Sequence, residues 1–275
     1  GVPITEEHNV IAIGRNAGAA IEDTGADGTV AIGRDALAAL TSGESNTAVG
    51  FEALKSQTTG GTSVAIGYQA LETANHTTAD GNTAVGYNAL QALATGASNT
   101  AVGVGAADVF EAGETDNTVI GANAMGSMKE GNGQVDQNVA LGVNALLGKD
   151  LADGGIAIVD NIAIGTQAMD SGSIGAQTGT IAIGAQALGA LTTGASNTVV
   201  GYQAGDALTT GYENTVLGNN ALGADVGGGR NVAIGHLALE TQTGVTGHQF
   251  NTVVGAYAGR YVSTGTENTF IGYLT

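Results

Sequence analysis

Hydrophobic residues in this chain recur in a short phrase, typified by the Asn-Thr-Ala-Val-Gly of residues 82–86, that appears fifteen times along 275 residues. We number each phrase from its glycine, which is position 0. The glycines are Gly14, Gly33, Gly50, Gly67, Gly86, Gly103, Gly121, Gly142, Gly165, Gly184, Gly201, Gly218, Gly235, Gly255 and Gly272. Their spacing is 17–23 residues. Such self-similarity is typical of a solenoid. The sequence therefore predicts an all-β fold, a parallel β-solenoid of about 15 rungs, forming one domain over residues 1–275.

The three residues before each glycine predict a strand with two apolar faces. Position −3 is Val, Ile or Thr and position −1 is Ile, Val or Leu, and these two side chains share one face because strand residues alternate. We expect that face to line the interior. Position −2 is mostly Ala and points the other way, which is typical of a strand buried on both sides.

A single coil has only one interior, so the −2 face is expected to pack against another copy of the chain. Alanine is also small enough to tolerate exposure, which is the alternative reading of this column. The larger apolar residues at −2 are the predicted oligomer face: Val119, Val199, Val216, Val253 and Phe270.

Asparagine at position −4 predicts a ladder of side-chain amide hydrogen bonds between stacked rungs. The ladder residues are Asn46, Asn82, Asn99, Asn117, Asn138, Asn161, Asn197, Asn214, Asn231, Asn251 and Asn268. The central glycine fits a corner with positive φ. Ala recurs at +3, and a second glycine column often appears ten residues after the first, as at Gly43 and Gly60. A rung is thus predicted to run strand, glycine corner, second short strand and turn.

Composition narrows the classes of partner and compartment. The chain has 47 glycines but one proline, which excludes collagen, and no cysteine, which excludes disulfides and thiolate metal sites. The formal net charge of −18 would repel a phosphate backbone, so we expect no nucleic-acid binding. No apolar run approaches a membrane-spanning length, so we expect no membrane insertion.

Candidate chemistry is sparse, and the sequence predicts a protein that is not an enzyme. The four histidines share no spacing, and no nucleophile elbow or complete dinucleotide loop is present. Asp23 and Asp27 stand in a segment with the composition of a calcium loop, although a solvated turn explains it as well. Calcium is thus the one cofactor with a candidate site. Aromatic residues at +1, such as Tyr68 and Tyr87, could stack on sugars, but corner packing or oligomer contacts are favoured.

Two versions of the phrase resemble known repeats. Residues 63–67 (Ser-Val-Ala-Ile-Gly) and 231–235 (Asn-Val-Ala-Ile-Gly) resemble the head repeats of trimeric autotransporter adhesins, although the adhesin repeat is shorter. Residues 99–103 (Asn-Thr-Ala-Val-Gly) and 214–218 (Asn-Thr-Val-Leu-Gly) are similar to phage tail-fibre repeats. The resemblance implies a left-handed β-roll and three chains around an axis. It also implies an extracellular, cell-surface or virion location and a cell-surface glycan or protein as receptor.

The predicted function is therefore that of a non-enzymatic structural or adhesive fibre protein, homo-oligomeric and most simply trimeric. An alternative follows from the last phrase, which stops at Thr275 without a polar cap. Open strand edges template further stacking, so the chain could instead be the subunit of a self-assembling extracellular filament joined end to end.

Overall fold

The computed structural model describes residues 9–21, 25–75, 81–111, 113–128, 134–148, 156–171, 177–243 and 246–275. Within these residues the chain consists of short strands and turns and contains no helix. It divides into two compact units, Gly1–Glu130 and Gly131–Thr275. The single domain expected over residues 1–275 stays a prediction.

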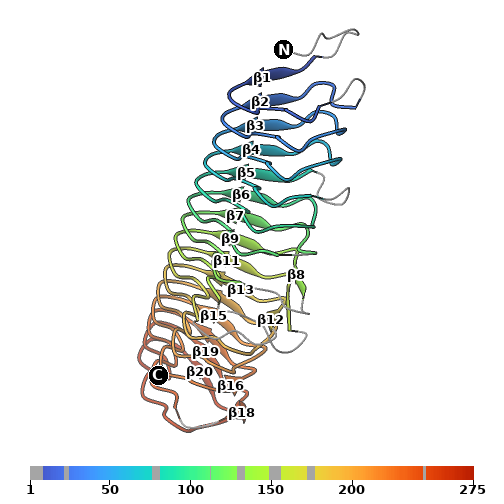
Figure 1. Cartoon of the computed structure of the whole chain (residues 1–275). Coiled ribbons are helices and arrows are strands. Elements are labelled where there is room, and N and C mark those ends of the chain that lie inside the picture. Colours follow the sequence, from blue (N-terminus) through green and yellow to red (C-terminus); the bar gives the residue numbers. More distant parts are fainter. Residues whose placement is uncertain are drawn as a thin grey trace. The chain divides into compact units, whose positions relative to one another are not determined.

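The first unit is a stack of seven three-residue strands, each supplied by one phrase (Figure 1). They are β1 (Ile11–Ile13), β2 (Val30–Ile32), β3 (Thr47–Val49), β4 (Val64–Ile66), β5 (Thr83–Val85), β6 (Thr100–Val102) and β7 (Thr118–Ile120). Each strand pairs in parallel with the next, and equal positions of the phrase face one another, as Ala48 faces Ala65. Extra residues between phrases are therefore absorbed in loops and do not shift the register.

The second unit repeats this arrangement with the remaining eight phrases (Figure 1). Its phrase strands are β9 (Val139–Leu141), β11 (Ile162–Ile164), β13 (Ile181–Ile183), β14 (Thr198–Val200), β15 (Thr215–Leu217), β17 (Val232–Ile234), β19 (Thr252–Val254) and β20 (Thr269–Ile271). They pair in parallel in that order.

Two small parallel sheets of the second unit are built from residues that precede the phrases. One has the order β12 (Gln177–Thr178), β10 (Ala157–Val159), β8 (Gln134–Asp136), and the other joins β16 (Gly228–Gly229) to β18 (Gly247–His248).

The parallel stacks confirm the predicted β-solenoid. Every phrase contributes one strand, but the structure has about 12 turns, somewhat fewer than the 15 rungs expected.

The glycine of each phrase forms a corner whose backbone no other residue can adopt comfortably. In the phrase strands the central glycines have φ between +131° and +147°. A Cβ at Gly86 would lie 2.2 Å from the carbonyl oxygen of Gly103 on the next rung. The rungs therefore approach one another so closely at this corner that glycine is required for space as well as for conformation.

The segment after the corner differs from the predicted second strand. Positions +2 and +4 both have positive φ, as at Asp35 (59°) and Leu37 (48°), so the chain bends through an arc of turns. The arc is still bonded from rung to rung: the Asp35 N–H donates to the Arg15 carbonyl at 2.9 Å and the Leu37 N–H to the Ala53 carbonyl at 3.0 Å. Non-glycine residues in this conformation are uncommon, and here the inter-rung hydrogen bonds hold them.

The interior is lined by position −2, not by positions −3 and −1 as expected. The alanines of this column, such as Ala48 and Ala65, are fully buried, together with Ala and Leu at +3 and +4, such as Ala53 and Leu54. The strand and the arc thus face each other across a narrow core. Alanine suits that core because two stacked layers leave little room between strand and arc.

Candidate functional site

The predicted oligomer face belongs to the core, which corrects the expectation drawn from its apolar character. Four of its members have 0–1% of their surface exposed, and Phe270 is half-buried. The fully buried members are Val119, Val199, Val216 and Val253. Their side chains pack inside their own coil, so a partner cannot reach them.

The opposite side of the sheet is the exposed one. We call the side chains at −3 and −1 of the phrase strands the outer face. At −1, Ile66 is 41% exposed, Ile120 38%, Leu141 40% and Leu217 49%. Position −3 is threonine in eight phrases and valine or isoleucine in the others, and no charged residue occurs at −3 or −1 in the fifteen phrases. The outer face is therefore an uncharged apolar surface on a chain whose net charge is −18.

An aromatic column borders the outer face in the first unit, at position +1. The rings of Phe51 and Tyr68 stack with centroids 4.9 Å apart, and those of Tyr68 and Tyr87 with centroids 5.1 Å apart. The Arg34 guanidinium extends the column, 4.0 Å from the Phe51 centroid. These rings cover one another's faces and leave mainly their edges to solvent, which fits corner packing better than stacking on a sugar.

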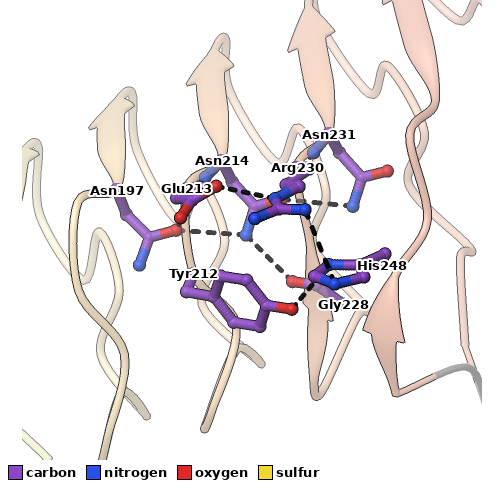
Figure 2. Close-up of polar contacts among 8 residues, drawn as sticks. All are labelled: Asn197, Tyr212, Glu213, Asn214, Gly228, Arg230, Asn231 and His248. Atoms are coloured by element: carbon purple, nitrogen blue, oxygen red, sulfur yellow. Dashed lines mark hydrogen bonds and ion pairs between the residues drawn. The ribbon is translucent and has the colours of Figure 1, made fainter.

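The asparagines at −4 lie inside the coil and bond to one another across rungs (Figure 2). Asn214 is a typical member: its Nδ2 donates to Asn197 Oδ1 at 3.1 Å and to the Gly228 carbonyl at 2.9 Å. Its Oδ1 accepts from the backbone N–H of Asn231 at 2.9 Å and from Asn231 Nδ2 at 3.2 Å. The side chain satisfies backbone groups at the bend before each strand, so its role is structural.

The same pattern links other ladder residues within each unit. Bonds between neighbouring asparagine side chains join Asn82, Asn99 and Asn117, then Asn138 and Asn161, and then Asn197, Asn214, Asn231 and, from Asn251, Asn268. Asn251 continues from Asn231 through its backbone N–H at 3.2 Å, and Asn46 Nδ2 donates to the Gly60 carbonyl at 2.8 Å.

A polar groove with a cavity volume of about 270 Å³ lies in the second unit on positions +2 and +5. Gln167, Gln186 and Gln203 line it at +2, and Gln203 Nε2 donates to Gln186 Oε1 at 2.9 Å. Asp170 and Asp206 line it at +5, and burial raises the pKa of both carboxyls. The middle rung has glycine at +5, which opens the hollow between them.

A second cluster of polar and aromatic side chains stands on the surface of the second unit (Figure 2). Tyr212 Oη and His248 Nδ1 are 2.7 Å apart, and Arg230 Nη1 is 3.5 Å from His248 Nε2. The two contacts use the two ring nitrogens of His248, so the imidazole bridges the tyrosine hydroxyl and the guanidinium. Arg230 Nε also donates to Glu213 Oε2 at 2.7 Å, and this hydrogen bond raises the pKa of Arg230.

Sequence analysis did not single out this cluster. Its signal was the long spacing before Gly255, which marks extra residues over 240–250, including His248 and Phe250. Insertions in repeat proteins are often binding surfaces. What the spacing could not supply was the contact of those residues with Tyr212 and Arg230 on earlier rungs.

The calcium candidates do not form a metal site within the described residues. Asp23 lies outside them, and Asp27 Oδ1 accepts from Asn9 N at 2.9 Å and Gly28 N at 3.0 Å, as in a turn. In the part of the chain that the structure describes, no group of three or more His, Asp or Glu side chains could hold a metal ion.

The described residues also include no helix long and apolar enough to cross a membrane. In comparisons with known proteins, no family model matches the chain and no curated protein is significantly similar to it.

Proposed function

We propose that the chain is a non-catalytic structural subunit of an extracellular or virion fibre, and that copies associate laterally through the outer face into a homo-oligomer, most simply a trimer. The observation that carries the proposal is the exposure of this uncharged apolar surface along each stack. Contiguous apolar surface on a soluble protein marks an interaction site. The trimeric number and the fibre location come from the resemblance to adhesin heads and tail-fibre repeats.

A second copy is the favoured occupant because the outer face is itself repetitive. Similar uncharged side chains recur at every rung, so two copies with the same rung spacing can match along each stack. Burial of the partly exposed −1 column contributes about 25 cal/mol for each Å² of apolar surface removed from water. Each added rung therefore strengthens the same contact.

The test compares charged substitutions on and off the outer face. Ile66→Glu and Leu217→Glu place a carboxylate on the face in each unit, and Val226→Glu, at a residue that is 50% exposed elsewhere, is the matched control. Native mass spectrometry should give a trimer for the wild type and the control, and a monomer for the double variant with unchanged circular dichroism.

A monomeric wild type, or a double variant that stays oligomeric, would contradict lateral association through this face. Electron microscopy of the same samples tests the alternative role of a filament subunit. Long filaments indicate end-to-end assembly, whereas short uniform particles do not. Filaments that persist in the double variant would assign assembly to the strand edges instead.

A further inference from the structure

Phe250 stands at position −5 of its phrase, beside Arg230 at position −5 of the preceding phrase. The spacing from Gly235 to Gly255 is 20 residues, against 17 for the preceding phrases. His248 in β18 lies within this longer interval, shortly before Phe250. The Phe250 ring centroid lies 5.6 Å from the Arg230 guanidinium carbon, and the Tyr212 centroid lies 5.9 Å from it.

The geometry points to a binding site for a neutral saccharide, which we call the Arg230 site and define as Tyr212, Glu213, Arg230, His248 and Phe250. Phe250 is 47% exposed; the Arg230 guanidinium lies over its ring, and the His248 ring is tilted by 38° to it with centroids 5.4 Å apart. The part of an aromatic ring that stays exposed can accept the apolar C–H face of a pyranose ring. This differs from the Phe51–Tyr68–Tyr87 column, where the rings cover one another.

Polar groups at the edge of the ring match the hydroxyls of a sugar. A hydroxyl both donates and accepts, so a pair of neighbouring hydroxyls is recognised best by adjacent donors and acceptors. Arg230 uses Nε for Glu213 and Nη1 for His248. Within the described part of the chain, Arg230 Nη2 and Glu213 Oε1 have no hydrogen-bond partner, so a donor and an acceptor remain side by side.

Charge decides which saccharides fit. The Arg230 guanidinium is already paired with the Glu213 carboxylate, so the site has no net positive charge to offer a sulfate or a sialic acid. The net charge of −18 on the whole chain adds repulsion against an anionic sugar. A neutral hexose or N-acetylhexosamine unit needs no positive charge in the site and is not repelled by the negative charge of the chain.

The contacts within the Arg230 site also prepare it for binding. The Tyr212–His248 hydrogen bond of 2.7 Å and the edge-to-face contact of their rings, 5.7 Å between centroids, hold the inserted segment against the earlier rungs. Side chains fixed before binding lose less conformational entropy when the ligand arrives. The inference does not depend on the oligomeric state and so goes beyond the proposed function.

The test uses the full chain and an array of neutral, sialylated and sulfated oligosaccharides, followed by calorimetric titration of each bound oligosaccharide in solution. Phe250→Ser removes the ring with a residue that position −5 already carries at the same φ, as at Ser196 (60°), compared with 55° at Phe250. Arg230→Gln follows the precedent of Gln137 (60°). Tyr87→Val is the matched control, since Tyr87 is 52% exposed and valine occurs at +1 in Val104.

We expect wild-type protein to bind neutral oligosaccharides, both site variants to bind at least tenfold more weakly, and the control to bind as wild type, with equal melting temperatures. Binding to no neutral oligosaccharide, binding only to charged ones, or equal binding by the site variants would overturn the inference. If Phe250→Ser fails to fold, the binding measured for Arg230→Gln tests the inference on its own. The mass of the oligomer is measured in a separate experiment. A failure of lateral association can therefore be distinguished from a failure of saccharide binding.

Discussion

At the residue scale, the central glycines are the positions where the repeat tolerates substitution least. Gly86 has φ +143°, and an added Cβ would lie 2.2 Å from a backbone oxygen that cannot move without moving a rung. Backbone strain and the collision act together, so Gly86→Ala should lower the free energy of unfolding by at least about 2 kcal/mol. Chemical denaturation followed by circular dichroism measures the change.

Gly179 provides the matched control for that substitution. Its φ of +61° is also positive, but nothing lies within 4 Å of an added Cβ, and other rungs carry non-glycine residues at the same position. Gly179→Asn should therefore change the free energy of unfolding by less than about 1 kcal/mol. Equal losses at Gly86 and Gly179 would show that the close approach of rungs is unimportant.

Asp225 is a buried carboxyl, and its titration makes stability depend on pH. The side chain is fully buried and Oδ1 accepts from the Gly228 N–H at 2.9 Å, yet burial is the larger influence and raises the pKa above its ordinary 3.8. The unfolded chain therefore ionises at lower pH than the folded one. The resulting penalty is absent below pH 3.8, grows as pH rises towards the raised pKa, and is complete above it.

Asp225→Asn removes this titration. We expect the free energy of unfolding of the variant, relative to wild type, to be highest at neutral pH and to fall as the pH is lowered towards 3.8. Melting temperatures of both proteins over that range provide the measurement. If the difference in melting temperature is constant with pH, or widens on acidification, then folding does not raise the pKa of Asp225.

At the scale of the element, the sizes of the strand and arc residues compensate for each other in two rungs. Most rungs combine Ala at −2 with Leu or Met at +4, whereas two rungs combine Val with Gly: Val199 with Gly205, and Val253 with Gly259. A Cβ at Gly259 would lie 3.3 Å from Val253 Cγ2, so the larger strand residue occupies space that leucine takes elsewhere. In these two rungs the larger strand residue and the smaller arc residue compensate for each other, whereas Val216 is accommodated together with Leu222.

The exchange predicts a coupled pair of substitutions. Val199→Ala alone leaves a cavity and should cost about 2 kcal/mol, and Gly205→Leu alone overfills the core and should cost about 1–3 kcal/mol. The double variant restores the common Ala and Leu pair, and Gly205 has the φ of +57° that leucine adopts at +4 in other rungs. A double-mutant cycle by denaturation should give a coupling energy above about 1 kcal/mol, whereas additive losses would exclude shared volume.

At the scale of the whole molecule, the question is which surface binds a second copy of the chain. The charged Ile66 and Leu217 variants address it directly, because they change the outer face and leave the core alone. Copies with a net charge of −18 repel one another, so contact has to come from a surface without charge. The outer face is such a surface. In the proposed oligomer the acidic residues would lie outside the contact.

Much of the fold could be predicted from the amino-acid sequence because each rung repeats the same local chemistry. The fixed period required parallel stacking, the glycine at 0 required a corner, and the asparagine at −4 fitted an interior ladder, as Asn214 illustrates. The Arg230 site was not predictable in the same way. It joins residues from rungs on either side of an insertion, and nothing in the local pattern of Tyr212 or His248 indicates that they meet.

The sequence by itself determined that each strand has two different faces, since side chains alternate with a period of two. Only the tertiary structure decided which face is inside. The alternation of side chains along a strand is the same whichever face the coil encloses. Hydrophobicity favoured the larger side chains at −3 and −1 as the interior ones. The space between strand and arc is too narrow for them. Ala48 and its equivalents fill it, and Ile66 and its equivalents face outward.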